Sequence, residues 1–127
     1  MAIIGIGVDV TKIDRIERLD RLYKQRFLNR IYHPSEIQLL ERAGNRGEFL
    51  AGRFAGKEAA KKAMGDFPGR GIGWNEIYVL NRPSGQPELL FEGKAAQLAE
   101  ELGVKKTHVS ISHDGGVAVA QVVLESE

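Results

Sequence analysis

The chain has 127 residues, of which 43% are hydrophobic and 28% are charged, an ordinary globular composition that excludes wholesale disorder and low-complexity character. It contains no cysteine, so disulfides, thiolate metal sites and cysteine nucleophiles are excluded. No apolar stretch reaches the roughly 20 residues of a membrane helix, and residues 1–5 do not resemble a secretory signal. We therefore expect a single cytoplasmic domain over residues 1–127, with no membrane contact.

Charge is distributed unevenly along the chain although the net charge is only +1. Residues 1–70 carry +5 (14 Lys and Arg against 9 Asp and Glu), whereas residues 71–127 carry −4 (4 against 8). The basic residues fall mainly on two helix-like segments, which favours an anionic partner.

The first half of the chain predicts one strand and three helices. Residues 3–10 form an apolar, β-branched run typical of a buried strand, and Thr11 is a suitable N-cap for the helix that follows. Apolar residues at helical spacing predict helices over residues 12–29 and 34–43, the second with Pro34 at its first position. Residues 48–64, rich in Ala, Leu, Glu and Lys, predict the strongest helix; its two interior glycines, Gly52 and Gly56, indicate close packing.

The second half predicts mainly strands. After a turn-rich loop at residues 65–73, strands at 76–80 and 88–91 are joined by a turn at Ser84 and Gly85. A short helix at residues 93–102 ends at Gly103, and residues 107–112 and 117–124 alternate as two further strands. This order predicts an α+β fold in which antiparallel strands pack with a long central helix.

Asp9 lies in an otherwise apolar strand, where an ionised carboxylate is costly without a cation or hydrogen-bond donors. It is either a capping or turn aspartate at the end of the first strand or an oxygen ligand for Mg²⁺, a hard cation that takes one or two carboxylates together with substrate phosphates.

Glu58 and Lys62 are spaced i, i+4 on the strongest predicted helix. They are either an ordinary ion pair on a solvated face or, since this helix is rich in small residues and closely packed, part of a metal site beside bound phosphates.

Two later segments could also carry chemistry. His113, at a predicted strand end beside a glycine turn, is either an exposed hairpin histidine or a phosphate donor or general base. Ser110 and Ser112 lack the Gly-x-Ser-x-Gly surroundings of a serine hydrolase. The glycine loop around Arg70 is either an ordinary turn or a phosphate-binding loop.

Taken together, three motifs resemble holo-[acyl-carrier-protein] synthase, the small bacterial class of 4′-phosphopantetheinyl transferase. The family's Gly-Ile-Gly-φ-Asp motif (φ, apolar) matches residues 5–9, its Arg-Phe-Ala-x-Lys-Glu-Ala-x-x-Lys motif matches residues 53–62 at every fixed position, and its Ser-φ-Ser/Thr-His motif matches residues 110–113. Order, spacing and total length agree from end to end.

The resemblance implies a reaction. Coenzyme A would donate its phosphopantetheine arm to a serine of apo acyl carrier protein in fatty-acid biosynthesis, releasing adenosine 3′,5′-bisphosphate. Asp9 and Glu58 would hold Mg²⁺, and Lys62 would stabilise the leaving phosphate. Arg53 and His113 would bind coenzyme A, and the serine proton would pass to Glu58 or to a metal-bound water.

The resemblance also implies protein partners. Acyl carrier proteins are acidic, so the basic first helix would dock them through Arg15, with Arg18, Arg21 and Arg26 extending the patch. Members of the family form homotrimers whose active sites lie between neighbouring chains.

A non-catalytic binding module, with the basic helix docking an acidic protein or nucleic acid, is the main alternative. Nucleic acid is disfavoured because the isoelectric point is near 8.0 and aromatic residues are not interleaved with basic ones. An inactive relative of the transferases is expected to have lost Asp9, Glu58 or Lys62, and all three are present.

Overall fold

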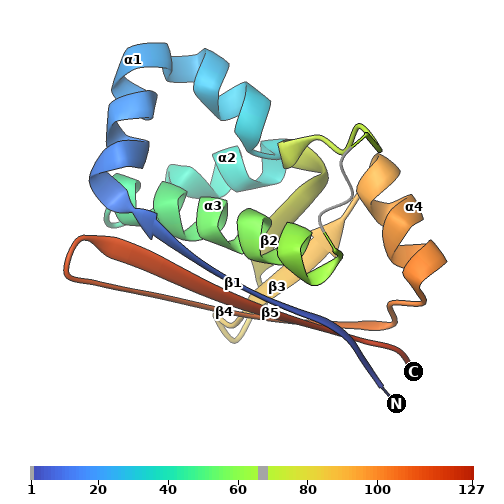
Figure 1. Cartoon of the computed structure of the whole chain (residues 1–127). Helices are drawn as coiled ribbons and strands as arrows, with labels where there is room; N and C mark the ends of the chain where they lie inside the picture. Colours follow the sequence, from blue (N-terminus) through green and yellow to red (C-terminus); the bar gives the residue numbers. More distant parts are fainter. Residues whose placement is uncertain (1, 66–68) are drawn as a thin grey trace.

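The computed structural model describes residues 2–65 and 69–127, and its order of elements is the predicted one (Figure 1). The strands are β1 (Ile3–Lys12), β2 (Ile77–Asn81), β3 (Pro87–Phe91), β4 (Lys106–Asp114) and β5 (Val117–Glu125). The helices are α1 (Ile13–Ile31), α2 (Pro34–Leu40), α3 (Arg46–Ala63), the 3₁₀ turn η1 (Trp74–Glu76) and α4 (Gly93–Leu102). The predicted α+β class with antiparallel strands and a long central helix is confirmed.

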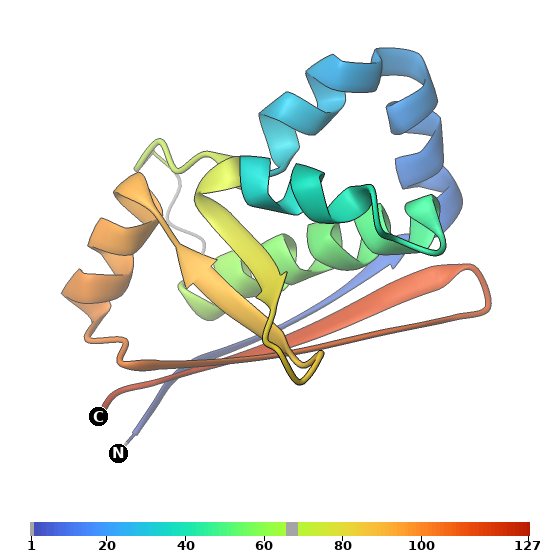
Figure 2. The same cartoon turned by 180° about the vertical axis from the view of Figure 1, so that it is seen from behind.

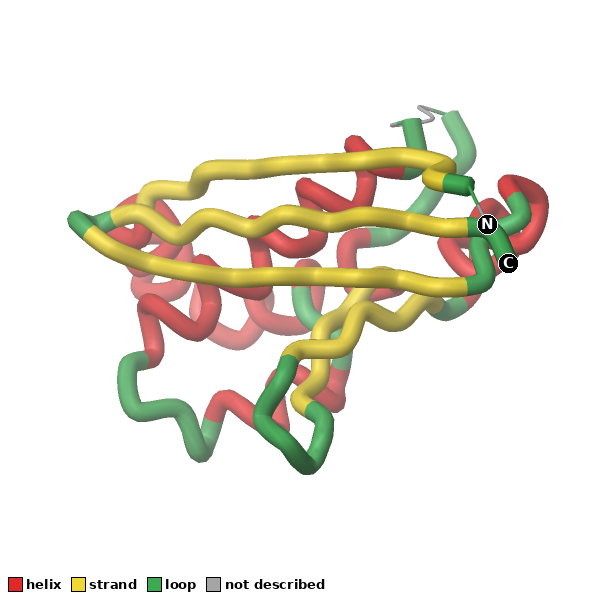
Figure 3. The backbone as a smooth tube through the Cα atoms, turned by 90° about the horizontal axis from the view of Figure 1, so that it is seen from below, coloured by secondary structure: helices red, strands yellow, loops and turns green. Residues whose placement is uncertain are grey.

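The strands form two antiparallel sheets. The larger has the order β1–β5–β4 and the smaller is the hairpin β2–β3. Helix α3 lies along one face of the larger sheet, and α1 and α2 lie beyond it (Figures 1 and 2). Seen from below, the three strands of the larger sheet lie in front of the helices that they overlap (Figure 3).

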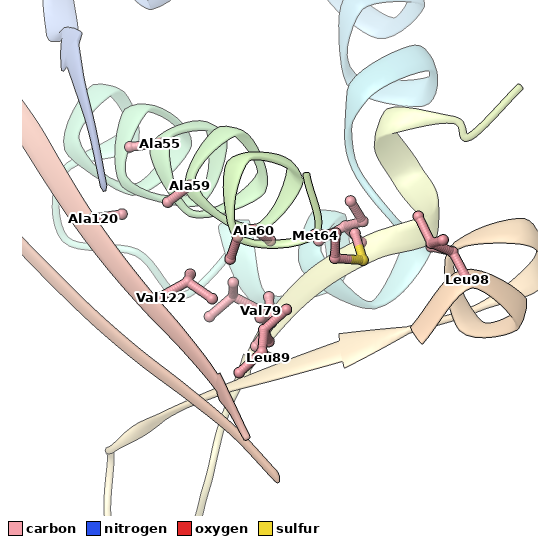
Figure 4. Close-up of a cluster of buried hydrophobic side chains, with 13 residues drawn as sticks. Ala55, Ala59, Ala60, Met64, Val79, Leu89, Leu98, Ala120 and Val122 are labelled. Carbon is pink, nitrogen blue, oxygen red and sulfur yellow. The ribbon is translucent and has the colours of Figure 1, made fainter. Parts of the chain in front are cut away.

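Small side chains let α3 lie close to both sheets. Ala55, Ala59 and Ala60 are fully buried on α3, and Val122 on β5 is fully buried opposite them (Figure 4). Close packing at Gly52 is confirmed, since a Cβ there would lie 3.0 Å from Cγ2 of Ile111 on β4.

Helix α1 covers a second group of core residues that includes Ile16, Phe27 and Leu50. The helix is broken at Lys24, whose φ of 49° and ψ of −127° are non-helical. Residues before and after Lys24 therefore belong to two differently directed segments, visible as the arch of α1 in Figure 1.

Two local predictions need correction or fall outside the described residues. Thr11 does not cap α1: the N-cap is Lys12, which makes no side-chain capping bond, because Thr11 is still in β1 and donates its hydroxyl to Asp9. The predicted loop at residues 65–73 includes residues 66–68, which lie outside the described part of the chain.

Among residues 2–65 and 69–127, no helix combines the length and the apolar character needed to span a bilayer.

Candidate active site

The glycines of the first motif bring β1 onto the backbone of α3. Side chains alternate along β1, and Gly5, Gly7 and Asp9 face α3. A Cβ on Gly5 would overlap the carbonyl oxygen of Ala63, and one on Gly7 would overlap that of Ala59. Only glycine permits this approach, which places Asp9, the next residue on the same face of the strand, beside the helix.

Asp9 is held by contacts from both elements. Its Oδ1 lies 3.3 Å from Nζ of Lys62, and its Oδ2 accepts a 2.6 Å hydrogen bond from the Thr11 hydroxyl. Lys62 also donates to the carbonyl of Val8 at 3.0 Å. Asp9 is therefore part of a strand–helix junction and is neither a capping residue nor a turn residue, which corrects the first interpretation given for it above.

Glu58 lies one helical turn before Lys62, on the flank of α3 that faces β1, and is partly buried. Since Lys62 reaches Asp9 across this junction, the two acids of the first two motifs lie on the same side of α3. They contribute carboxylate oxygens, the ligands that Mg²⁺ prefers. No cluster of three or more His, Cys, Asp or Glu side chains able to hold a metal exists in the described part of the chain, so further ligands would come from phosphate, water or a neighbouring chain.

Arg53 and His113 meet at a different place, a cavity of about 530 Å³ lined by α3 and the β2–β3 and β4–β5 hairpins. Nη2 of Arg53 donates to Oδ1 of Asn81 at 2.9 Å, and its guanidinium lies 4.2 Å from the ring centroid of Phe49. His113 approaches Glu48, with 3.3 Å between Nδ1 and Oε2.

The Arg53 guanidinium is poorly solvated. Burial lowers the pKa of Arg53, although Glu36 acts in the opposite direction. Its Nε is buried and has no hydrogen-bond partner among the described residues. An anion in this cavity would both supply that partner and offset the desolvated charge.

The two groups lie on different flanks of α3. Glu58 follows Arg53 by five residues, about 140° around a helix of 3.6 residues per turn. Gly56 lies on a third flank, with a Cβ position 3.3 Å from Cγ2 of Val79. The structure thus brings Lys62 to Asp9, with Glu58 one helical turn before Lys62, and places Arg53 and His113 in one cavity on another flank of α3.

The four arginines proposed to dock a carrier protein are all exposed on α1. Arg15, Arg18 and Arg21 lie on the first segment. Arg26 lies beyond the break at Lys24, where it lines a separate cavity of about 650 Å³. The basic surface is therefore divided between two segments, which the helical pattern did not predict.

Arg70 follows the glycine loop's undescribed residues, and its guanidinium forms an ion pair with the carboxylate of Glu101. This charge is therefore already paired within the chain.

Sequence reasoning missed two features next to the motifs. Lys57 is fully buried and paired with Glu36, and Trp74 stacks on Phe54 with Lys61 over its ring. The small residues around Lys57 were a usable signal that its face of the helix is packed. No comparable signal in the sequence points to Trp74.

The match to known sequences defines the class. The signature of the 4′-phosphopantetheinyl transferase superfamily matches residues 5–122, which include both acids, Lys62, Arg53 and His113. The holo-[acyl-carrier-protein] synthase of Nitratidesulfovibrio vulgaris is 48% identical over 124 residues, covering 98% of this chain and 99% of that protein.

Solved structures agree with that class. The holo-[acyl-carrier-protein] synthase of Neisseria meningitidis superposes with a TM-score of 0.89 at 33% identity, over 98% of this chain and 100% of that one. That of Bacillus anthracis, in complex with CoA (3′,5′-ADP), superposes with a TM-score of 0.80 at 36% identity, over 98% of each chain. The chain belongs to the holo-[acyl-carrier-protein] synthase family and is a phosphopantetheinyl transferase.

Proposed function

We propose that this enzyme transfers 4′-phosphopantetheine from coenzyme A to a serine of apo acyl carrier protein in fatty-acid biosynthesis. The serine oxygen forms a bond to the phosphorus that carries the pantetheine arm. The bond from that phosphorus to the bridging oxygen breaks, adenosine 3′,5′-bisphosphate leaves, and the serine proton is lost to Glu58 or to water. The Bacillus anthracis relative, solved with CoA (3′,5′-ADP), supports the choice of donor and product.

The observation that carries the proposal is the junction of β1 and α3, with Asp9 and Glu58 on one side of the helix and Lys62 3.3 Å from Asp9. Two carboxylates fit Mg²⁺, which is usually bound by one or two carboxylates and keeps positions for substrate phosphates and water. When bound, the ion would neutralise negative charge on the diphosphate. Lys62, whose side chain is 52% exposed, would place its ammonium beside the departing phosphate.

The cavity lined by Arg53 and His113 is a candidate binding site for the nucleotide end of coenzyme A. Both side chains can donate to phosphate oxygens, and the buried Nε of Arg53 has no hydrogen-bond partner in the part of the chain that the structure describes. Because this cavity and the Asp9–Glu58 pair lie on different flanks of α3, we propose that a neighbouring chain completes each active site in a homotrimer.

The exposed face of the larger sheet supports such an assembly. On β1 the side chains of Ile6, Val8 and Val10 are 56%, 53% and 62% exposed. The register places Ile6 beside Val123 and Val10 beside Val119 of β5, with the exposed Gln121 opposite Val8, so the apolar surface extends onto β5 on either side of one glutamine. A contiguous apolar patch of this kind is typical of a protein–protein interface.

Intact mass spectrometry of apo acyl carrier protein tests the proposed reaction. With coenzyme A and Mg²⁺ the carrier should gain the mass of one phosphopantetheine arm, and EDTA should prevent the gain. Asp9→Asn and Glu58→Gln should each slow transfer at least about 100-fold, since a catalytic metal stabilises the transition state by several kcal/mol.

The matched control is Glu100→Gln, at an exposed position of α4, which should transfer at the wild-type rate. Full activity of both acid variants would refute the metal assignment. A folded wild-type enzyme that binds coenzyme A but modifies no apo carrier protein would refute the proposed reaction.

A further inference from the structure

Four side chains from three elements form a continuous row beside the candidate active site. The guanidinium carbon of Arg15 on α1 lies 5.9 Å from the ring centroid of Phe54 on α3. Phe54 stacks on Trp74 of η1, with 5.1 Å between centroids and 19° between the ring planes. Nζ of Lys61 lies 4.1 Å from the centroid of Trp74. Two stacked aromatic rings thus have a cation at each end.

This row runs along the same side of α3 as Glu58. Phe54, Glu58 and Lys61 are spaced i, i+4 and i+7, so their side chains leave one side of the helix. Lys62 is rotated further toward β1, where it contacts Asp9. Glu58 therefore lies between the Lys62–Asp9 contact on one flank and the aromatic row on the other.

The indole holds the Lys61 ammonium without neutralising it. A cation over the face of tryptophan is attracted by the ring quadrupole, and tryptophan is the strongest of the aromatic partners. A free lysine side chain loses conformational entropy when it is immobilised on binding, which weakens the association. Contact with Trp74 removes part of that cost in advance and leaves a full positive charge for a ligand.

We propose that Lys61 is a further docking residue for the acidic carrier protein, positioned by Trp74; this rests on the proposed function. Lys61 and Arg15 end the same row, so the basic surface of α1 continues onto α3 across the two rings. The cations proposed to contact the phosphates of coenzyme A lie elsewhere on α3. Lys62 is on the side of Glu58 that faces β1, and Arg53 is on another side of the helix. Charge complementarity therefore favours a carboxylate-rich protein surface at Lys61 over the phosphates of coenzyme A.

Steady-state kinetics with each substrate varied in turn tests the proposal. Lys61→Gln should raise KM for apo carrier protein about three- to fivefold at low salt, the size of one exposed charge contact. It should leave kcat and KM for coenzyme A unchanged, and the effect should shrink as ionic strength rises. Arg15→Ala should behave in the same way. Lys105→Gln, which removes an exposed lysine just before β4, is the matched control and should match wild type.

Trp74 supplies an independent binding measurement because it is the only tryptophan in the chain. Titration with apo carrier protein should change its fluorescence emission, and the fitted Kd should rise about three- to fivefold in Lys61→Gln. Trp74→Phe, which keeps an aromatic face, should have a KM for the carrier close to that of wild type. Trp74→Leu should raise the KM for the carrier about as much as Lys61→Gln does. Circular dichroism and thermal unfolding of the two Trp74 variants would exclude a folding defect.

Each alternative result is decisive. If Lys61→Gln raises KM for coenzyme A, or lowers kcat with carrier KM unchanged, Lys61 serves the phosphates or the chemistry and the proposal is wrong. An effect that does not vary with salt would also overturn it. Wild-type transfer in the same assay reports on the proposed function. If wild type is active and Lys61→Gln has the wild-type KM for the carrier, only this inference is refuted. A wild type that neither binds nor modifies a carrier protein refutes both.

Discussion

Lys57 and Glu36 form an ion pair in which both side chains are fully buried, with 2.5 Å between Nζ and Oε1. Glu36 also accepts hydrogen bonds from the backbone N–H groups of His33 and Val79, at 3.0 and 2.9 Å, and Lys57 donates to the carbonyl of Ile77. Burial lowers the pKa of Lys57, against the opposing effect of Glu36. The pair joins α2, α3 and β2, and so holds the helix that carries both groups of candidate site residues.

Removal of one partner should be strongly destabilising, and removal of the second should add less than its separate cost. Lys57→Met leaves the Glu36 carboxylate buried without a cation and should lower the free energy of unfolding by about 3–5 kcal/mol. Adding Glu36→Gln to Lys57→Met should cost less than the two separate losses combined, because the uncompensated charge is gone. Urea unfolding measures both. Lys105→Met, at an exposed position, should change stability by less than about 0.5 kcal/mol; an equally small effect of Lys57→Met would contradict the buried pair.

At the scale of elements, the approach of β1 to α3 decides where Asp9 stands. Gly5 and Gly7 lie against the carbonyl groups of Ala63 and Ala59, with no room for a Cβ. The obstacle is helix backbone, which cannot rotate away as a flexible side chain can. Any side chain at these two positions must therefore separate strand from helix.

Gly7→Ala should destabilise the protein by at least about 3 kcal/mol, the upper part of the range for overpacking, and should reduce transferase activity in the fraction that remains folded. Gly44→Ala is the matched control, because no atom of the described residues lies within 4 Å of its added Cβ. Its stability should be within about 0.5 kcal/mol of wild type. Thermal and urea unfolding of the two variants give the comparison. A Gly7→Ala protein as stable and active as wild type would show that β1 does not need this close approach.

At the scale of the whole molecule, the exposed apolar residues of β1 and the divided candidate site support the same assembly. Val8 lies near the middle of β1 with its side chain 53% exposed, and it pairs with Gln121 of β5. In a homotrimer this face would be covered, and a charge placed on it would be buried without a partner.

Light scattering after size exclusion should give wild type a mass near three times the 14.0 kDa of one chain. Val8→Asp should shift the mass to that of one chain and abolish most activity, while the circular dichroism spectrum stays native. Gln97→Asp is the control, because Gln97 is at an exposed position of α4. This variant should remain assembled and active. A fully active wild-type monomer would contradict the shared site.

Much of the fold was predictable because the signals are local. The predicted helix at residues 93–102 has the bounds of α4, since its end depends on Gly103, which adopts φ 80°. The predicted strand at residues 107–112 is too short, because the additional residues of β4 are held by pairing with β5. The break of α1 at Lys24 was missed because the apolar spacing continues through it.

The residues of the candidate site were all present in the motifs, and their type and spacing were enough to indicate the family and its reaction. Only the tertiary structure decided how they are grouped: Glu58 and Lys62 beside Asp9, and Arg53 with His113 on another flank of α3. The same holds for Lys61, which its own sequence neighbours do not distinguish from any other surface lysine. The physical reason is that composition and local spacing report which groups a segment carries, whereas helix rotation, strand register and close backbone packing determine which groups from distant segments meet.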